Sequence, residues 1–156
     1  MESRVEEAVR LFESGYGCCQ AVFSTYADLL GMDKKLALRL ASPMGAGIGR
    51  MREVCGTISA MALLEGLKEG NDDASDAKAK AANYEKVRQM SDTFTEMNGS
   101  IICRELIGLA GRKREESAMP KERTETYYKE RPCTKLVRSA AMIVETQLLP
   151  EMFADA

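Results

Sequence analysis

The sequence predicts an all-α protein, a single-domain bundle of about six to seven helices around a central buried helix that spans residues 1–156. Three observations favour this fold class. Apolar residues recur at intervals of three and four along most of the chain, and no segment shows the alternation of a strand that we would defend. Hydrophobic residues make up 45% of the chain and charged residues 29%, the balance of an ordinary globular domain. A length of 156 residues suffices to bury a core without disulfide bonds.

The first three helices are recognised by their apolar faces and by the residues that end them. The first helix ends at the turn formed by residues 14–17. The second carries apolar residues at helical spacing and stops at Gly31. Asp33 is a suitable N-cap for a short third helix, which closes before Pro43.

A fourth helix is expected from about Arg50 to Lys68. Residues 58–64, in its middle, are apolar nearly all round, so we expect this helix to be the buried centre of the bundle. Gly56 and Ala60 lie four residues apart on one face of this helix. Their small size would let a neighbouring helix approach closely.

The second half of the chain contains three further helices separated by a charged segment. The fifth helix ends at Asn98-Gly99, and Ser100 can cap a short sixth helix through Leu109. Residues 111–131 are charged and poorly patterned, so we expect a charged loop or a partly helical cover. The last helix begins at Pro132, since proline is favoured at the first helical position.

Composition excludes several classes of function. The net charge is −2, and the 22 Lys and Arg are interspersed among 24 Asp and Glu, so we expect no nucleic-acid partner. No apolar run approaches the roughly 20 residues of a membrane helix, and the acidic start lacks the pattern of a signal peptide. We therefore expect a cytoplasmic protein without membrane insertion. The chain has no histidine, which excludes Cys-His catalytic pairs and zinc sites that mix cysteine with histidine.

Five cysteines are the residues best suited to chemistry: Cys18, Cys19, Cys55, Cys103 and Cys133. In a reducing compartment they are not expected to form permanent structural disulfides. Three of the four separated positions fall in the first turn of a predicted helix, and Cys55 falls one turn in. Helix N-termini favour a thiolate over a thiol, as do cations nearby in sequence. These cations are Arg50, Arg52, Arg104, Arg131 and Lys135.

Two interpretations of these cysteines stay open from placement alone. If the helix starts converge, four sulfurs could meet and act as reactive thiols or as ligands of a cluster, and at least one of Cys55 and Cys103 should then be an acidic thiol. Alternatively, the thiols are inert core residues, because free cysteine often behaves as a small hydrophobe. Cys19 lies four residues before Phe23 on an apolar stripe, so we assign it to packing.

The segment before the fourth helix also allows two interpretations. Gly45, Gly47 and Gly49 alternate before Arg50, and backbone N–H groups at such a position could hold an anion. However, the segment follows a helix instead of a strand, so it does not fit a dinucleotide-binding motif. A tight turn with close packing is the favoured interpretation, and these four residues are a weak candidate for anion or cofactor binding.

Four segments of the chain resemble, in order, the C_GCAxxG_C_C family of putative redox-active proteins. They are Gly15-Tyr16-Gly17-Cys18-Cys19-Gln20-Ala21-Val22, Gly45-Ala46-Gly47-Ile48-Gly49-Arg50-Met51-Arg52-Glu53-Val54-Cys55-Gly56, Asn98-Gly99-Ser100-Ile101-Ile102-Cys103-Arg104-Glu105-Leu106, and Arg131-Pro132-Cys133. The resemblance runs from about residue 5 to residue 146 and covers nearly the whole chain.

The resemblance implies that Cys18, Cys55, Cys103 and Cys133 are the four cysteines of the family and that Cys19 is an extra one. A similar domain occurs in split-Soret cytochromes, which are electron-transfer proteins. This chain departs from the family pattern at three places: Thr57 and Ala60 replace the alanine and the final glycine of the central motif, and Gly17 stands where asparagine is usual before the first cysteine. Thr57 adds a hydroxyl near the sulfur, whereas Ala60 is still small.

Three hypotheses of function follow. The first is a thiol–disulfide redox protein with an unknown redox partner, in which Cys55 and Cys103 react and Cys18 and Cys133 resolve or support. The second is an electron-transfer protein that binds an iron–sulfur cluster through the same four cysteines. The third is a non-catalytic helical interaction domain, a homodimer with buried inert thiols.

Overall fold

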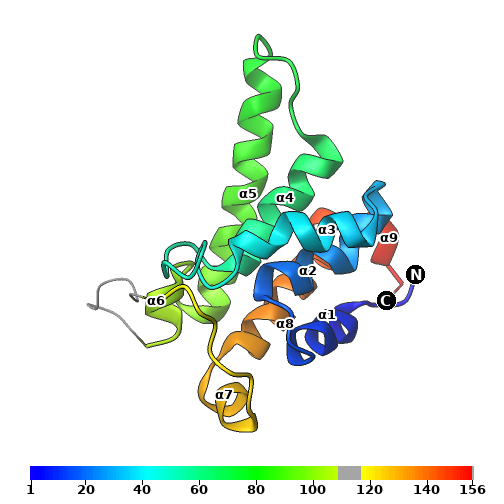
Figure 1. The fold of residues 1–156 in the computed structure, drawn as a ribbon. Helices are drawn as coiled ribbons and strands as arrows, with labels where there is room; N and C mark the ends of the chain where they lie inside the picture. Colours follow the sequence, from blue (N-terminus) through cyan, green and yellow to red (C-terminus); the bar gives the residue numbers. More distant parts are fainter. Residues whose placement is uncertain (109–116, 156) are drawn as a thin grey trace.

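The computed structural model describes residues 1–108 and 117–155, and these residues confirm the all-α prediction (Figure 1). Their one β-type pairing is an isolated antiparallel bridge between Val54 and Ile102. None of their helices combines the length and the apolar character needed to cross a bilayer. The described residues form nine α-helices, whereas about six to seven were expected. They are α1 Val5–Glu13, α2 Cys18–Ala27, α3 Lys34–Ala41, α4 Gly56–Glu69, α5 Ala77–Asn98, α6 Cys103–Leu106, α7 Glu125–Glu130, α8 Cys133–Ile143 and α9 Pro150–Phe153.

The helices form a packed body from which one hairpin projects. α2 packs against α1, α3, α4 and α8, while α5 packs against α4 and α8. Beyond these contacts, the far ends of α4 and α5 and the turn between them extend away from the body (Figure 1). The two ends of the chain lie side by side, and the amino group of Met1 donates a hydrogen bond to the carbonyl of Met152 at 2.9 Å.

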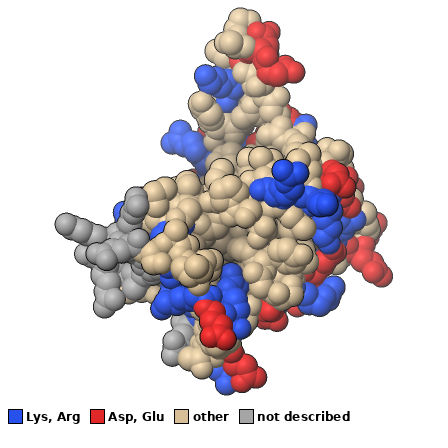
Figure 2. All heavy atoms as spheres, viewed as in Figure 1, with Lys and Arg blue, Asp and Glu red and all other residues tan. Residues whose placement is uncertain are grey.

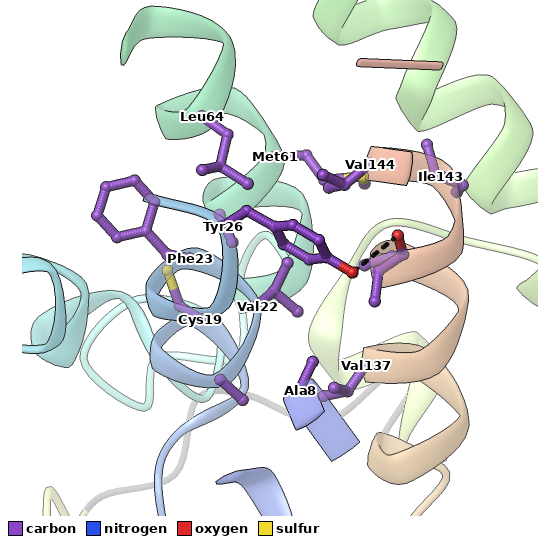
Figure 3. Packing of buried hydrophobic residues seen from close by; sticks show 14 of the residues in the cluster. Ala8, Cys19, Val22, Phe23, Tyr26, Met61, Leu64, Val137, Ile143 and Val144 are labelled. Carbon is purple, nitrogen blue, oxygen red and sulfur yellow. Dashed lines mark hydrogen bonds between the residues drawn. The ribbon is translucent and has the colours of Figure 1, made fainter. Parts of the chain in front are cut away.

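The central buried helix is α2, whereas we expected it to be the fourth helix. Every residue from 21 to 27 is buried, so α2 is enclosed on all sides. Figure 3 shows Phe23 and Tyr26 among side chains of α4 and α8. Small residues at Ala21 and Ala27 let neighbouring helices come close around α2. α4 buries one side and leaves Leu63, among others, partly exposed.

The fourth helix begins at Gly56 instead of Arg50, because the segment before it turns the opposite way. Five consecutive residues and a sixth have positive φ angles between 53° and 73°, the region of a left-handed turn. A right-handed helix cannot contain such residues, and four of the six are not glycine. The six are Ala46, Gly47, Ile48, Gly49, Arg50 and Arg52.

The remaining helix ends agree with the sequence analysis in part. Asp33 accepts a hydrogen bond from the N–H of Leu36 and so caps α3 as predicted. α6 ends at Leu106, so the sixth helix is shorter than expected, and Leu109 lies outside the described residues. The segment 111–131 was expected to be either a charged loop or partly helical, and it contains the helix α7. Its residues 111–116 lie outside the described ones.

The last predicted helix is confirmed and is interrupted near its end. Pro132 is the N-cap of α8, one residue before the first helical position. After α8 the chain makes one π-helical turn, Val144–Leu148, and then α9. The turn presents buried Glu145 to the core, where the carboxylate accepts hydrogen bonds from the Tyr26 hydroxyl and the Arg4 backbone N–H, both at 2.7 Å. These bonds tie the two ends of the chain to α2.

Candidate functional site

Four cysteines from distant parts of the chain line one cavity of about 410 Å³. Cys18, Cys103 and Cys133 are the first residues of α2, α6 and α8, and Cys55 is the N-cap of α4. All four therefore stand at helix starts, whereas the sequence analysis had placed Cys55 one turn into its helix. The structure thus brings together the four positions that the resemblance implied.

Cys18 sits where the start of α2 meets the start of α4. A Cβ atom added to Gly56 would lie 2.5 Å from Cys18 Sγ and 3.1 Å from the backbone nitrogen of Cys19. Only glycine therefore allows the two helices to approach this closely. The start of α2 is fixed by Gln20, whose Oε1 accepts the N–H of Gly17 at 2.9 Å and whose Nε2 donates to the carbonyl of Leu38 at 2.9 Å. These contacts hold Cys18 beside the first turn of α4.

Backbone pairing holds Cys55 and Cys103 side by side. The N–H of Cys55 donates to the carbonyl of Ile101 at 2.8 Å, and the N–H of Cys103 donates to the carbonyl of Glu53 at 2.6 Å. These two bonds surround the bridge between Val54 and Ile102. The pairing joins the segment before α4 to the segment before α6, although the two are far apart in sequence.

Each of these two sulfurs has a polar neighbour. Cys55 Sγ lies 3.1 Å from Thr57 Oγ1, in hydrogen-bond contact. The hydroxyl that Thr57 adds to the family motif therefore does lie at the sulfur, as expected. Arg52 Nη1 donates to Cys103 Sγ at 3.6 Å, and this arginine is itself buried. A guanidinium at this place stabilises negative charge on the sulfur of Cys103.

The expectation of an acidic thiol at Cys55 or Cys103 is wrong. Burial raises the pKa of the Cys55 thiol far above its ordinary range, the neighbouring Cys18 raises it further, and the Thr57 hydrogen bond offsets only part of the rise. Burial also raises the pKa of Cys103, against the opposing hydrogen bond and charge of Arg52. Burial raises the pKa of Cys133 to about 12, although Arg131 and Arg123 lower it. Desolvation of the charged form thus outweighs the positive surroundings.

The cysteines differ in accessibility. Cys55 and Cys103 are 4% and 7% exposed, whereas Cys18 and Cys133 are only partly buried. Cys19 is fully buried in the hydrophobic core beside Phe23 and does not line the cavity, so its packing role is confirmed (Figure 3). A reagent in the cavity would therefore reach Cys18 or Cys133 before the two deeper sulfurs.

The glycine segment contributes side chains to the cavity and forms a tight turn. The N–H groups of Gly45, Gly49 and Arg50 donate to the carbonyls of Ser42, Pro43 and Gly45 within the turn. These three N–H groups are thus engaged within the turn, which favours the tight-turn interpretation. A Cβ at Gly47 would lie 2.6 Å from the Glu53 nitrogen, which explains glycine there by close packing. Gly45, Gly49 and the Arg50 side chain line the cavity.

Part of the segment 111–131, expected above to be a charged loop or a partly helical cover, lines the cavity that the cysteines share. Ala118, Pro120, Lys121 and Arg123 from the segment before α7 line the cavity, together with Tyr127 of α7. These residues show no helical or strand pattern, so their placement had no signal in the sequence beyond their charge. The cover is joined to the glycine segment by a 2.9 Å hydrogen bond from Arg50 Nη1 to the carbonyl of Ser117.

Four cysteine thiolates are a donor set that can hold an iron–sulfur cluster, provided that the sulfurs are grouped closely enough. Within residues 1–108 and 117–155, no three Cys, Asp or Glu side chains are grouped so that they could hold a metal ion. The sulfurs as they stand therefore share a cavity without forming a metal-binding group. All five cysteines are free thiols.

Comparison with known proteins gives one match. The model of the family described as "Putative redox-active protein (C_GCAxxG_C_C)" matches residues 16–147, which include the four cysteines of the cavity. No curated protein and no solved structure matches the chain.

Proposed function

The chain belongs to the C_GCAxxG_C_C family of putative redox-active proteins, and from this premise we propose that it carries out thiol–disulfide exchange. The observation that supports the proposal best is that Cys18, Cys55, Cys103 and Cys133 stand at four helix starts around one cavity. Disulfide chemistry requires only two of these sulfurs to meet at a time. That the four cysteines share one cavity supports such a pairing.

We assign the first attack to Cys18. It is more accessible than Cys55 or Cys103, and its charge raises the pKa of Cys55, Cys103 and Cys133, so it lies near all three. This reverses the roles expected from the sequence, because the two deeper thiols are nearly inaccessible. Cys55 is the candidate for the resolving thiol, since Cys18 Sγ lies at the first turn of α4, next to Cys55.

The proposed reaction has two displacements. The Cys18 thiolate attacks one sulfur of a disulfide, forms a mixed disulfide and expels the other half as a thiolate. The Cys55 thiolate then attacks Cys18 Sγ, expels the second half and leaves a Cys18–Cys55 disulfide. The two protons lost by the protein thiols go to the two released thiolates. The substrate disulfide is reduced by two electrons and the protein is oxidised by two, and a cellular dithiol restores the protein by the reverse exchange.

Because the pKa values of the cavity thiols are raised, the rate of exchange should depend on how readily these thiols lose their protons. Thiolates are the attacking species, and burial keeps Cys55 and Cys133 protonated at neutral pH. Exchange should therefore accelerate as the pH rises above neutrality. A reducing compartment such as the cytoplasm, the location expected above, would supply the dithiol.

The iron–sulfur alternative is favoured by one observation, the presence of four thiols and several cations around the same cavity. A bound cluster would supply one-electron transfer. Because no three of the described Cys, Asp or Glu side chains are grouped to hold a metal, we derive no step through a cluster.

Anaerobic purification followed by mild oxidation tests the proposal. The protein should be colourless and iron-free, and peptide mapping after oxidation should find a disulfide between Cys18 and Cys55. Cys18→Ser should slow exchange with a small disulfide by at least about 100-fold, since the attacking thiol is lost. Cys19→Ala, at the adjacent but buried position, is the matched control and should leave the rate within about twofold.

Three results would contradict the proposal. Brown protein whose colour is lost in each single Cys→Ser variant at the four cavity positions would establish the cluster. A disulfide that omits Cys18 would overturn its assigned role. Colourless protein that forms no disulfide and reduces none would leave the third hypothesis, an interaction domain with inert thiols.

A further inference from the structure

The cavity that contains the thiols is lined by positive charge. Among its described lining residues are four cationic side chains and no Asp or Glu. The chain as a whole carries a net charge of −2, so this lining reverses the sign of the protein around it. Figure 2 shows Lys and Arg side chains gathered on the face between α6 and α7, next to a few acidic ones. The four are Arg50, Arg52, Lys121 and Arg123.

Arg123 is held in place by groups that carry no negative charge. Its guanidinium stacks over the rings of Phe12 and Tyr127 at 4.7 and 4.9 Å. Nη1 and Nη2 donate to the carbonyls of Phe12 and Tyr16, both at 3.4 Å. An arginine has five N–H donors, and two long bonds to carbonyls leave donors for a ligand. Aromatic faces fix the plane of the guanidinium, and the contacts that Arg123 makes with the described residues bring no carboxylate to it.

We infer that the cavity selects small disulfides that carry a negatively charged group such as a carboxylate, with Arg123 as the residue that receives this group. The inference rests on the thiol–disulfide function proposed above. A volume of about 410 Å³ lies within the range of small-molecule pockets and can take a small disulfide. Arginine binds a carboxylate through two parallel hydrogen bonds, which also orients the molecule toward the sulfurs.

The cations could instead act on the thiols alone. Arg123 and Arg131 both lower the pKa of Cys133, and the loss of either one would change this thiol in the same way whatever disulfide is offered. Only a residue that contacts the ligand changes the preference between disulfides of different charge. Arg131 does not line the cavity, so it provides a control with the same charge and a similar effect on the thiol.

Exchange rates with three symmetrical disulfides test the inference. The probes are dithiodipropionate, which is anionic, hydroxyethyl disulfide, which is neutral, and cystamine, which is cationic. Each rate is divided by the rate of the same probe with a free small thiol, which corrects for its intrinsic reactivity. We expect the normalised rate to be about tenfold higher for the anionic than for the neutral probe, the factor that about 1.4 kcal/mol produces. The cationic probe should be slowest, and the preference should shrink from about 0.05 to 0.5 M salt.

Variants assign the preference to its residue. Arg123→Gln should lower the anionic-to-neutral ratio to about one or below, and Arg123→Lys should restore part of it. Arg131→Gln should affect all probes alike and leave the ratio within about twofold. Lys121 is exposed, so Lys121→Gln provides a variant that keeps the fold, and it should lower the ratio by about two- to threefold.

The possible failures are distinct. If the wild-type protein reacts with all three probes at equal normalised rates, the charge preference is wrong and thiol–disulfide exchange stands. If the wild type shows the preference and Arg123→Gln leaves the ratio unchanged, the role assigned to Arg123 is wrong. If no probe reacts faster with the protein than with the free thiol, the proposed function itself is wrong, and the preference is rejected with it.

Discussion

The contact between Cys18 and Gly56 gives the sharpest test of how the site is assembled. A methyl group at Gly56 would lie 2.5 Å from Cys18 Sγ and 3.1 Å from the Cys19 nitrogen, both well inside contact distance. The sulfur belongs to a short side chain and the nitrogen to the start of a helix, so neither can give way without moving α2. Overpacking of this kind costs about 1–3 kcal/mol. Gly56→Ala should therefore lower the melting temperature by roughly 2–12 °C for a chain of this size.

Gly66 in the same helix is the matched control, and its replacement should have the opposite effect. A Cβ at Gly66 meets nothing within 4 Å, and the residue is exposed. Alanine in a helix interior is favoured over glycine by up to about 1 kcal/mol. Gly66→Ala should therefore raise the melting temperature by roughly 2–4 °C. Thermal and urea unfolding under reducing conditions measure both variants.

A double-mutant cycle identifies the atom responsible. Cys18→Ala removes the sulfur, so Gly56→Ala should cost about 1 kcal/mol less in that background than in the wild type. Equal costs in the two backgrounds would show that Cys18 Sγ does not lie against α4. A Gly56→Ala protein at least as stable as the wild type would refute the close approach of α2 and α4 altogether.

Two further predictions concern buried groups. Tyr26→Phe removes the 2.7 Å hydrogen bond to the Glu145 carboxylate and should cost about 1–2 kcal/mol in urea unfolding, whereas Tyr84→Phe, at a side chain that is 60% exposed, should cost nothing measurable. Cys133 has a folded-state pKa of about 12, so above about pH 8.5 the unfolded chain releases this proton while the folded protein keeps it. The free energy of unfolding should therefore fall with rising pH, and Cys133→Ser should make this slope shallower by about 1.4 kcal/mol per pH unit; an unchanged slope would contradict the raised pKa.

The helices could be predicted from the sequence wherever side-chain periodicity decides them. α1, α3 and α8 begin or end close to the expected places because apolar faces and capping residues fix them, as Asp33 does for α3. The fourth helix was expected six residues too early, because four non-glycine residues adopt positive φ angles that no local pattern indicates. The central position of α2 depends on which helices surround it, and that is a property of the whole bundle.

Of the residues in the site, the four cysteines could be predicted from the sequence. Helix starts and the family resemblance led to the four cysteines, and the structure places all four around one cavity. The prediction of a low thiol pKa was wrong because cations near a cysteine can be read from the sequence, whereas the depth of burial that raises the pKa cannot. Arg123 was missed because its role depends on ring contacts with Phe12, which is more than a hundred residues away.

Arg123 has a second role in the proposed reaction, because burial disfavours thiolates in this cavity whereas a nearby guanidinium favours them. Burial already disfavours the thiolates, as the raised pKa of Cys133 shows. An anionic disulfide would bring a further negative charge into the cavity that these sulfurs share, which would disfavour a thiolate there. A guanidinium that pairs with the carboxylate removes this penalty as well as attracting the ligand. In Arg123→Gln, a carboxylate-bearing disulfide should thus lose its advantage over a neutral one, and the ratio should fall to about one or below. A ratio that stays near tenfold in this variant would show that Arg123 does not receive the carboxylate.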